Sequence, residues 1–382
     1  MIKSHLLYLT TEDSFFCSHF IERAQAAIDA GFKVTVVTRV NDHGDVIRQA
    51  GCNLIHLNID RRTLDLRHQL NILRELVNIF NTQQPDILHN VAIKPILIGT
   101  LAARLAKVRL IVNAPVGMGY VFASKDFKAW LLRPVLRLAF GFLLNPLGSR
   151  VVFENRDDFQ QLIGEGFVRE EMAVLIRGAG INLDQFRPAP EPDGEVVVIL
   201  VARMLRDKGV YEFVEAARLL LAQGIAARFR LIGAPDPGNP ASIDFSTLTL
   251  WNSEGCVEWL GHRDDILEQL SASHIACLPS YREGLPKSLL EALACGRAVV
   301  TTDVPGCREV VVDGENGFLV PARDSSALAK ALKILIKDAK LRSSFGVKGR
   351  ARAEAYFGSE RVVSETVTLY QSLIRSTASI KK

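Results

Sequence analysis

The sequence of 382 residues is poor in the features that mark secreted or membrane-spanning proteins. Its six cysteines form no Cys-x-x-Cys pair, and Cys277 and Cys295 lie in apolar surroundings, which favours reduced, buried thiols in the cytoplasm. No apolar run reaches about 18 residues, so no membrane-spanning helix is expected. The short apolar run at the N-terminus leads directly into polar residues, so it predicts a strand and not a signal peptide.

Signals for metal and dinucleotide chemistry are also missing. The eight histidines have no paired ligand spacing and no Asp-x-Asp occurs, so we expect neither a metal nor another cofactor. Gly117 and Gly119 lack the third glycine of a dinucleotide fingerprint. They could instead let the backbone approach a ligand at a cleft, or form a simple flexible turn.

Length and charge set the broad outline. A chain of 382 residues is long enough for two domains. The net charge is only +4, yet residues 61–150 hold 13 basic and 4 acidic residues. Such a local excess favours an anionic partner, for example a lipid diphosphate, a membrane surface or a nucleic acid, although a solvated basic face is the alternative.

Apolar runs alternate with helical patterns through the first half of the chain, which predicts a parallel sheet wrapped by helices. The expected strands are 5–9, 33–38, 53–57, 86–91, 110–113 and 151–154, and the expected helices are 18–30, 67–83, 95–106, 127–144 and 156–164. The alternation stops at a proline-rich stretch, residues 187–194, which is typical of a linker.

A second series of the same kind follows the linker. Its expected strands are 196–202, 227–232, 257–260, 275–279 and 298–302, and a short piece follows at 317–320. Its expected helices are 209–223, 263–271, 286–296 and those from 325 onward. The chain therefore predicts two doubly wound α/β domains with a cleft between them.

Two glutamates flank the start of one helix in this second series. Glu283 lies in the loop after strand 275–279, and Glu291 lies in the helix that Pro286 opens. Such loops bind ligands in open α/β sheets, and a nucleotide-sugar could use both carboxylates together with the helix N-terminus. On spacing alone, two solvated glutamates around an ordinary helix start would explain the pattern equally well.

A second loop adds cations. Arg203 and Lys208 follow the first strand of the second domain, where a guanidinium and an ammonium could bracket a diphosphate. Fixed cations there would stabilise a departing nucleoside diphosphate. Alone, an arginine and a lysine in a loop are more often ordinary surface residues, but their place in the same sheet as the two glutamates favours a site.

The sequence resembles the family 4 retaining glycosyltransferases of the GT-B fold, which have two Rossmann-like domains. The matching motifs are Ala202-Arg203 with Lys208-Gly209, the run from Pro279 to Pro286 with Glu291-Ala292, and the run from Thr302 to Gly306 with Glu309 and Asn316-Gly317. The resemblance implies that Arg203 and Lys208 hold the diphosphate and act in catalysis. Glu291 would bind the ribose, Glu283 would lie beside the donor sugar as a catalytic residue, and the backbone of Gly284, Leu285 and Pro286 would line the sugar pocket.

The first half resembles the branch that acts on polyprenyl-diphosphate-linked sugars in surface polysaccharide or glycan assembly. The residues that carry this are 86–95, 117–122, 152–158 and 178–182. His89, Lys94, Gly117 and Gly119 are then candidates for the acceptor or the cleft, although His89 could equally be a hydrogen-bonded structural histidine.

The expected helix 127–144 is apolar but carries cations. Arg133 and Arg137 share one face of it. It could lie at a membrane interface with these arginines at lipid phosphates, or pack inside the domain with both side chains reaching solvent. We therefore include Arg133 and Arg137 among the acceptor or cleft candidates.

The expected protein is a transferase at the inner face of the cytoplasmic membrane. It would move a sugar from a nucleotide-sugar, most simply a UDP-sugar, to a lipid-linked acceptor, with retention and without nucleic acid as partner. The expected domains are residues 1–186 for the acceptor and 195–357 for the donor, with a helix at about 358–382 packing back on the first. The alternatives are a cytosolic transferase with a soluble acceptor, a UDP-N-acetylglucosamine 2-epimerase and a non-catalytic nucleotide-sugar-binding subunit.

Overall fold

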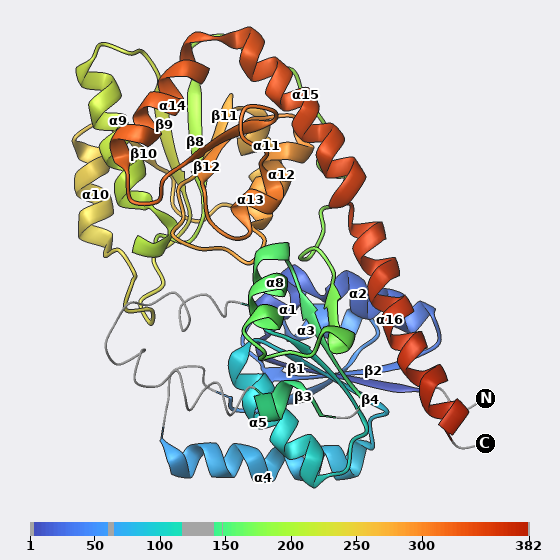
Figure 1. Cartoon of the computed structure of the whole chain (residues 1–382). Helices are drawn as coiled ribbons and strands as arrows, with labels where there is room; N and C mark the ends of the chain where they lie inside the picture. Colours follow the sequence, from blue (N-terminus) through green and yellow to red (C-terminus); the bar gives the residue numbers. More distant parts are fainter. Residues whose placement is uncertain (1–3, 60–64, 117–140, 147, 381–382) are drawn as a thin grey trace. The chain divides into compact units, whose positions relative to one another are not determined.

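The computed structural model describes residues 4–59, 65–116, 141–146 and 148–380. The chain divides into two compact units, an N-terminal unit of residues 1–179 with 360–382 and a C-terminal unit of residues 180–359 (Figure 1). Each unit is an α/β structure on one parallel sheet, as the sequence predicts. Within the described ranges, no helix is both long enough and apolar enough to cross a membrane.

The N-terminal unit contains a seven-stranded sheet in the order β3-β2-β1-β4-β5-β6-β7. Its strands are β1 (His5–Glu12), β2 (Lys33–Arg39), β3 (Asn53–His56), β4 (Ile87–Val91), β5 (Leu110–Ala114), β6 (Ser149–Phe153) and β7 (Ala173–Leu175). Strands β4 and β5 are buried along their whole length, because helices cover both faces of the sheet.

The helices of this unit include one from the far end of the chain. They are α1 (Asp13–His19), α2 (Ile21–Asp29), α3 (Gly44–Gln49), α4 (Leu66–Gln83), α5 (Ile93–Leu105), α8 (Arg156–Gly164), the short 3₁₀ helix η1 (Glu170–Met172) and α16 (Ser359–Ile380). Helix α16 inserts Val362, Leu369, Tyr370 and Leu373 into the core that packs on β1 and β4.

The C-terminal unit has a six-stranded sheet in the order β10-β9-β8-β11-β12-β13. Its strands are β8 (Val197–Val201), β9 (Arg228–Ile232), β10 (Glu258–Trp259), β11 (Ile275–Leu278), β12 (Ala298–Thr302) and β13 (Gly317–Val320). Its helices are η2 (Arg206–Lys208), α9 (Val210–Ala222), α10 (Phe245–Ser253), α11 (Ile266–Ser271), α12 (Lys287–Ala294), α13 (Cys307–Val310), α14 (Ser325–Lys337) and α15 (Ala339–Tyr356). The order of the strands reverses between β8 and β11, which is where open α/β sheets bind ligands.

The helices differ from the sequence prediction at several points. The helix expected over 18–30 corresponds to α2, because the backbone leaves the helical conformation at Phe20, and α1, α3 and α13 were not expected. Helix α10 was not expected at all, since it buries only Leu248 and Trp251 and so has little periodicity. Its one local signal is Asp244, whose carboxylate accepts a hydrogen bond from the Thr247 amide as an N-cap.

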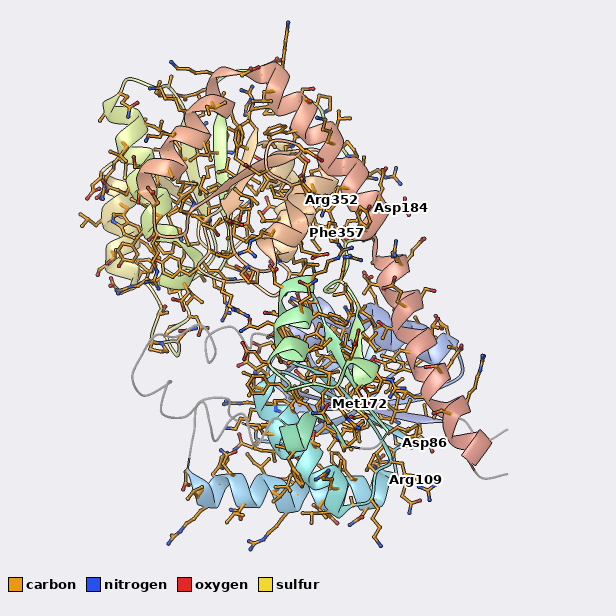
Figure 2. The ribbon with its side chains drawn as sticks, in the orientation of Figure 1. Asp86, Arg109, Met172, Asp184, Arg352 and Phe357 are labelled. Carbon is orange, nitrogen blue, oxygen red and sulfur yellow. The ribbon has the colours of Figure 1, made fainter. Side chains whose placement is uncertain are left out.

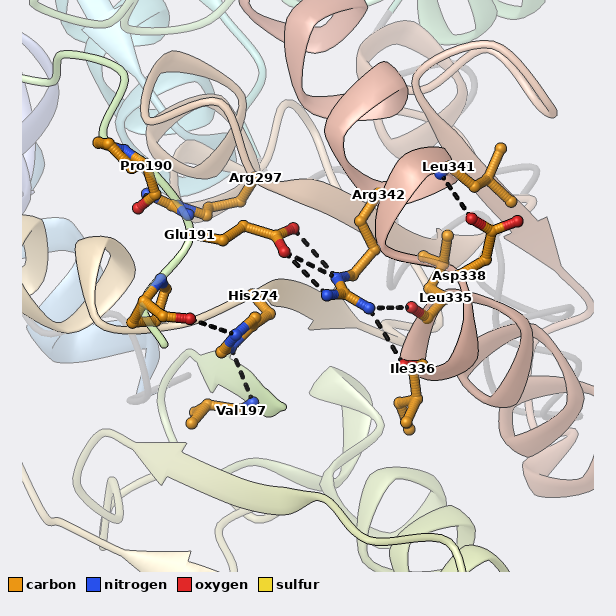
Figure 3. A network of polar contacts seen from close by, with 11 residues as sticks. Pro190, Glu191, Val197, His274, Arg297, Leu335, Ile336, Asp338, Leu341 and Arg342 are labelled. Carbon is orange, nitrogen blue, oxygen red and sulfur yellow. Dashed lines mark hydrogen bonds and ion pairs between the residues drawn. The ribbon is translucent and has the colours of Figure 1, made fainter. Parts of the chain in front are cut away.

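The proline-rich segment 187–194 is not a free linker, and the boundary between the units lies earlier, between Ala179 and Gly180. Figure 3 shows how the segment is fixed to the C-terminal unit. Arg342, whose side chain is 6% exposed, donates to both carboxylate oxygens of Glu191 at 2.8 and 3.0 Å. Arg297 donates to the carbonyl oxygens of Ala189 and Pro190.

His274 completes this network at the other end of the segment (Figure 3). Its Nδ1 accepts from the Val197 amide at 3.0 Å, so its Nε2 carries the hydrogen that is donated to the Pro192 carbonyl at 3.0 Å. Burial lowers the pKa of His274, which keeps the ring in this neutral form. The negative charge of Glu191 raises the pKa of His274 and so opposes the effect of burial.

The two passages of the chain between the units are bonded to each other. The Ile181 amide donates to the Phe357 carbonyl at 2.8 Å, and the Ser359 amide donates to the Ile181 carbonyl at 2.9 Å. Figure 2 shows Phe357 beside Arg352, whose guanidinium lies 5.8 Å from the ring centre. Gly180 permits the close approach, since a Cβ there would lie 2.7 Å from the Ser359 Cα.

Candidate active site

The candidate site begins with two loops that the sheet topology brings together. The loop after β8 carries Arg203 and Lys208, and the loop after β11 carries Glu283; the two strands are paired neighbours. Gly209 allows the loops to touch, because its φ is +71° and a Cβ would lie 2.0 Å from the Pro279 carbonyl oxygen. Any other residue at position 209 would push the two loops apart.

An ion pair joins the loops at the centre of the site. Lys208 Nζ lies 2.6 Å from Glu283 Oε1, and the two side chains are 23% and 10% exposed. Ser280 Oγ donates to the same oxygen at 2.6 Å. Both contacts are to Oε1, which leaves Oε2 to a ligand. The sequence predicted both charged residues but not Ser280 as their partner.

Arg203 is oriented by a residue that the sequence did not reveal. Its Nη1 lies 2.8 Å from Asp236 Oδ2, and the arginine side chain stays 53% exposed. Asp236 belongs to the loop after β9. This loop can approach the loop after β8 because residue 233 is a glycine: a Cβ at this position would lie only 1.8 Å from the Ala202 carbonyl oxygen. Arg203 and Lys208 are thus both held by carboxylates, with donor hydrogens remaining for an anion.

Glu291 is the buried carboxyl group of the site. It lies in α12, is 9% exposed, and its carboxylate accepts no hydrogen bond from the described residues. Burial raises its pKa to about 7, although Lys287 one turn earlier opposes the effect. A buried carboxylate without donors is a group that ligand hydroxyls would stabilise.

The segment Gly284–Pro286 lies between these two glutamates and is supported from behind. The Glu283 amide donates to the Pro305 carbonyl at 3.4 Å. Gly306 has a φ of +79°, and a Cβ there would lie 2.5 Å from the Gly284 carbonyl oxygen. The loop after β12 therefore holds the backbone of the expected sugar pocket in place.

The candidates of the N-terminal unit are placed differently. His89 is 1% exposed in β4, with Nδ1 2.7 Å from the Tyr370 hydroxyl and its ring stacked on Tyr8 at 5.1 Å. Burial, and then Arg23, lower its pKa to about 3, so it is neutral. The contacts fit the structural interpretation of His89 and not a ligand contact, because the core between β4 and α16 encloses the ring.

Lys94 remains a candidate for the acceptor. It lies in the first turn of α5, directly after the carboxyl end of β4, and is half-buried. Ala92, at the N-cap of this helix, has a φ of +76°, which is unusual for a residue other than glycine. Gly117, Gly119, Arg133 and Arg137 lie outside the described residues.

A metal centre does not form among the residues that the structure describes: no three His, Cys, Asp or Glu side chains gather there to hold an ion. The charges of the candidate site come from Arg203, Lys208, Asp236 and two glutamates.

Comparison with known proteins matches both halves of the chain. Residues 182–352 match the family described as glycosyl transferases group 1, and residues 5–144 match the glycosyl transferase 4-like family. The sucrose-phosphate synthase of Thermosynechococcus elongatus superposes with a TM-score of 0.80, at 20% identity, over 98% of this chain and 100% of the other. In class, the protein is a glycosyltransferase of the GT-B fold.

Curated relatives match most of the chain. The chain is 29% identical to the N,N′-diacetylbacillosaminyl-diphospho-undecaprenol α-1,3-N-acetylgalactosaminyltransferase of Campylobacter jejuni, over 92% of this chain and 94% of that one. It is 24% identical to the UDP-Gal:α-D-GlcNAc-diphosphoundecaprenol α-1,3-galactosyltransferase of Escherichia coli, over 82% of each. The chain belongs to the family 4 glycosyltransferases.

The buried carboxyl of Glu291 gives a prediction on pH. If ligand hydroxyls donate to it, only its ionised form binds well, and that form is lost as the pH falls through about 7. At pH 6 about one tenth is ionised, so UDP should bind up to about 10-fold more weakly than at pH 8 because of this group. Calorimetric titration of UDP at several pH values measures the slope.

The Glu291→Gln variant is the control for this measurement. UDP has its own phosphate ionisation at a pKa of about 6, which contributes to the slope in both proteins. The wild type should show the steeper dependence between pH 6 and 8. Equal slopes would remove the Glu291 carboxylate from the nucleotide site.

Proposed function

We propose that the protein transfers a sugar from a UDP-sugar to a polyprenyl-diphosphate-linked sugar, with retention of the anomeric configuration and without a metal. The binding of the donor is supported by the Lys208–Glu283 pair, which lies where the order of the strands reverses. Arg203 lies in the same loop as Lys208, and Glu291 lies in α12, the helix that follows the loop of Glu283. The acceptor half is supported by the two relatives, whose names specify diphospho-undecaprenol-linked sugars.

In this proposal the C-terminal unit binds the donor. The Glu291 carboxylate accepts hydrogen bonds from the ribose hydroxyls, which supply the donors that it lacks. Arg203 and Lys208 bind the diphosphate, which would otherwise need a divalent cation. Glu283 Oε2 and the backbone of Gly284–Pro286 contact the sugar.

In this proposal the reaction takes place on one face of the sugar. The bond from the sugar C1 to the phosphate oxygen breaks while the acceptor hydroxyl oxygen bonds to C1 on the same face. The hydroxyl proton passes to the departing phosphate oxygen, whose growing negative charge Arg203 and Lys208 stabilise. Glu283 is not a covalent nucleophile in this scheme, because the acceptor attacks on the face from which the phosphate departs; Lys208 and Ser280 hold Oε1, and the carboxylate orients the sugar and stabilises positive charge at C1.

Retention has separate support. The E. coli relative is named for a UDP-Gal donor and an α-1,3 product. UDP-galactose holds its sugar in the α configuration, so an α product keeps it. The donor sugar of this protein depends on a few side chains of the pocket and is left open.

The site of action in this proposal is the inner face of the cytoplasmic membrane. A lipid-linked acceptor is presented there, and residues 61–150 carry 13 basic against 4 acidic residues, which favours an anionic surface. The protein would attach as a peripheral protein.

One assay tests the proposal and separates its alternatives. Purified full-length protein is incubated with radiolabelled UDP-sugars and a polyprenyl-diphosphate-sugar extract in anionic vesicles, with EDTA present. We expect label in the lipid fraction, an α linkage, and protein that sediments with the vesicles.

Each alternative gives a different result. Label in a water-soluble product would indicate a soluble acceptor. An altered UDP-sugar without acceptor would indicate an epimerase. Binding of UDP without any turnover would indicate a non-catalytic subunit, and loss of activity in EDTA would contradict a metal-free site.

A further inference from the structure

Tyr281 links the two loops of the donor site on both sides of Lys208. Its amide donates to the Asp207 carbonyl at 2.9 Å, one residue before Lys208. Its hydroxyl donates to Glu212 Oε1 at 2.7 Å, in the first turn of α9. Tyr281 itself lies two residues before Glu283, so its backbone amide and its hydroxyl together connect the loop of the carboxylate to the chain on both sides of the lysine.

Glu212 depends on this tyrosine. Its Oε2 is buried and has no hydrogen-bond partner in the described part of the chain. Burial raises the pKa of Tyr281, and the hydrogen bond to Glu212 raises it further, so the phenol stays protonated and donates at any working pH. The bond to a charged acceptor is stronger than one between neutral groups.

An arginine from a third loop packs on the same ring. The Arg323 guanidinium lies 4.5 Å from the centre of the Tyr281 ring, in the loop between β13 and α14. Arg323 has a φ of +65°, which a non-glycine residue adopts at an energetic cost. The loops after β8, β11 and β13 thus converge on Tyr281, although none of the tyrosine's contacts is to Lys208 or Glu283 side-chain atoms.

We propose that Tyr281 is a positioning residue that sets the distance between Lys208 and Glu283. It thereby fixes the ammonium that would bind the diphosphate relative to the carboxylate that would contact the sugar. Arg323 holds the tyrosine ring from the other side. This proposal rests on the proposed function, because the two charged groups are the ones that would meet the donor. The Lys208–Glu283 contact is only 2.6 Å long, and small displacements of reacting groups have large effects on rate.

The first test is Tyr281→Phe, which removes the hydroxyl and keeps the ring under Arg323. We expect kcat to fall about 10- to 100-fold, while the Kd of UDP changes less than about 3-fold, because Arg203 and Glu291 still bind the nucleotide. Tyr211→Phe is the matched control: Tyr211 lies in α9, its ring packs on Trp251 of α10, and kcat should be unchanged.

A double variant separates positioning from simple stabilisation. In Tyr281→Phe/Glu212→Leu neither buried partner is left unpaired, so the thermal midpoint should recover towards that of the wild type. If Tyr281 positions the loops, kcat stays low in this double variant. Recovery of kcat together with the thermal midpoint would overturn the proposal.

A structural readout does not depend on any activity. In a crystal structure of Tyr281→Phe, we expect the distance from Lys208 Nζ to Glu283 Oε1 to exceed about 4 Å, the limit of an ion pair. An unchanged pair would overturn the positioning role even if the protein proved to be no transferase. A protein without transfer activity in which the pair separates would contradict only the proposed function.

Discussion

Replacing Lys208 with alanine is expected to lower kcat about 10²- to 10³-fold, the range found when one donor to a developing anion is removed. Two effects add. The transition state loses a cation near the departing diphosphate, and Glu283, whose side chain is only 10% exposed, loses the partner at 2.6 Å that compensates its charge. UDP should also bind more weakly, as it should in Arg203→Ala. Steady-state kinetics and calorimetric titration with UDP measure the two effects.

Two further variants show which effect dominates. Glu283→Gln keeps Lys208 and should reduce turnover far more than affinity for UDP, because the carboxylate acts on the sugar. Arg206→Ala is the matched control, since Arg206 belongs to the same 3₁₀ helix but its guanidinium lies over the Tyr211 ring. Full activity in Lys208→Ala or in Glu283→Gln would remove that residue from the catalytic role.

The second large effect concerns stability. Arg342→Leu is expected to lower the free energy of unfolding by about 3–5 kcal/mol, the usual result of breaking a buried ion pair from one side. Arg342 donates three hydrogen bonds to the Glu191 carboxylate and also donates to the carbonyl oxygens of Leu335 and Ile336 at the end of α14. The variant leaves both the carboxylate and these carbonyls without their partner. Urea denaturation followed by fluorescence measures the change.

Matched controls test the cause of this loss. Arg187→Leu breaks an ion pair in the same segment, but that pair is 71% and 89% exposed and should contribute less than about 1 kcal/mol. Arg342→Leu/Glu191→Leu removes both charges and should regain much of the stability. Equal stability of Arg342→Leu and wild type would show that the segment is fixed by other contacts.

Much of the sheet could be predicted because parallel strands are short apolar runs, and strand β12 has the predicted bounds. The candidate site was predicted in part. Motif spacing indicated Arg203, Lys208, Glu283 and Glu291, but the partners of these residues depend on strand order. Asp236 meets Arg203 only because β9 and β8 are neighbours, which no local pattern reveals.

Two features depend on contacts that the sequence does not reveal. Composition indicates that segment 187–194 is irregular, but it cannot indicate that Glu191 finds Arg342 151 residues later in the chain. The alternation of apolar residues placed His89 in a strand. Whether that strand position faces a ligand or the core depends on α16, since Tyr370 comes from the far end of the sequence.

The bonded passages near Ile181 and Phe357 have a consequence for engineering. In connectivity the C-terminal unit is an insert, because residues 180–359 lie between the two parts of the N-terminal unit. That unit is complete only when α16 is included. The ends of the insert are already held together by backbone hydrogen bonds between residues 181 and 357–359. The segment is therefore suited to expression alone or to exchange between relatives, whereas truncation before α16 would strip Tyr370 from the core of the other unit.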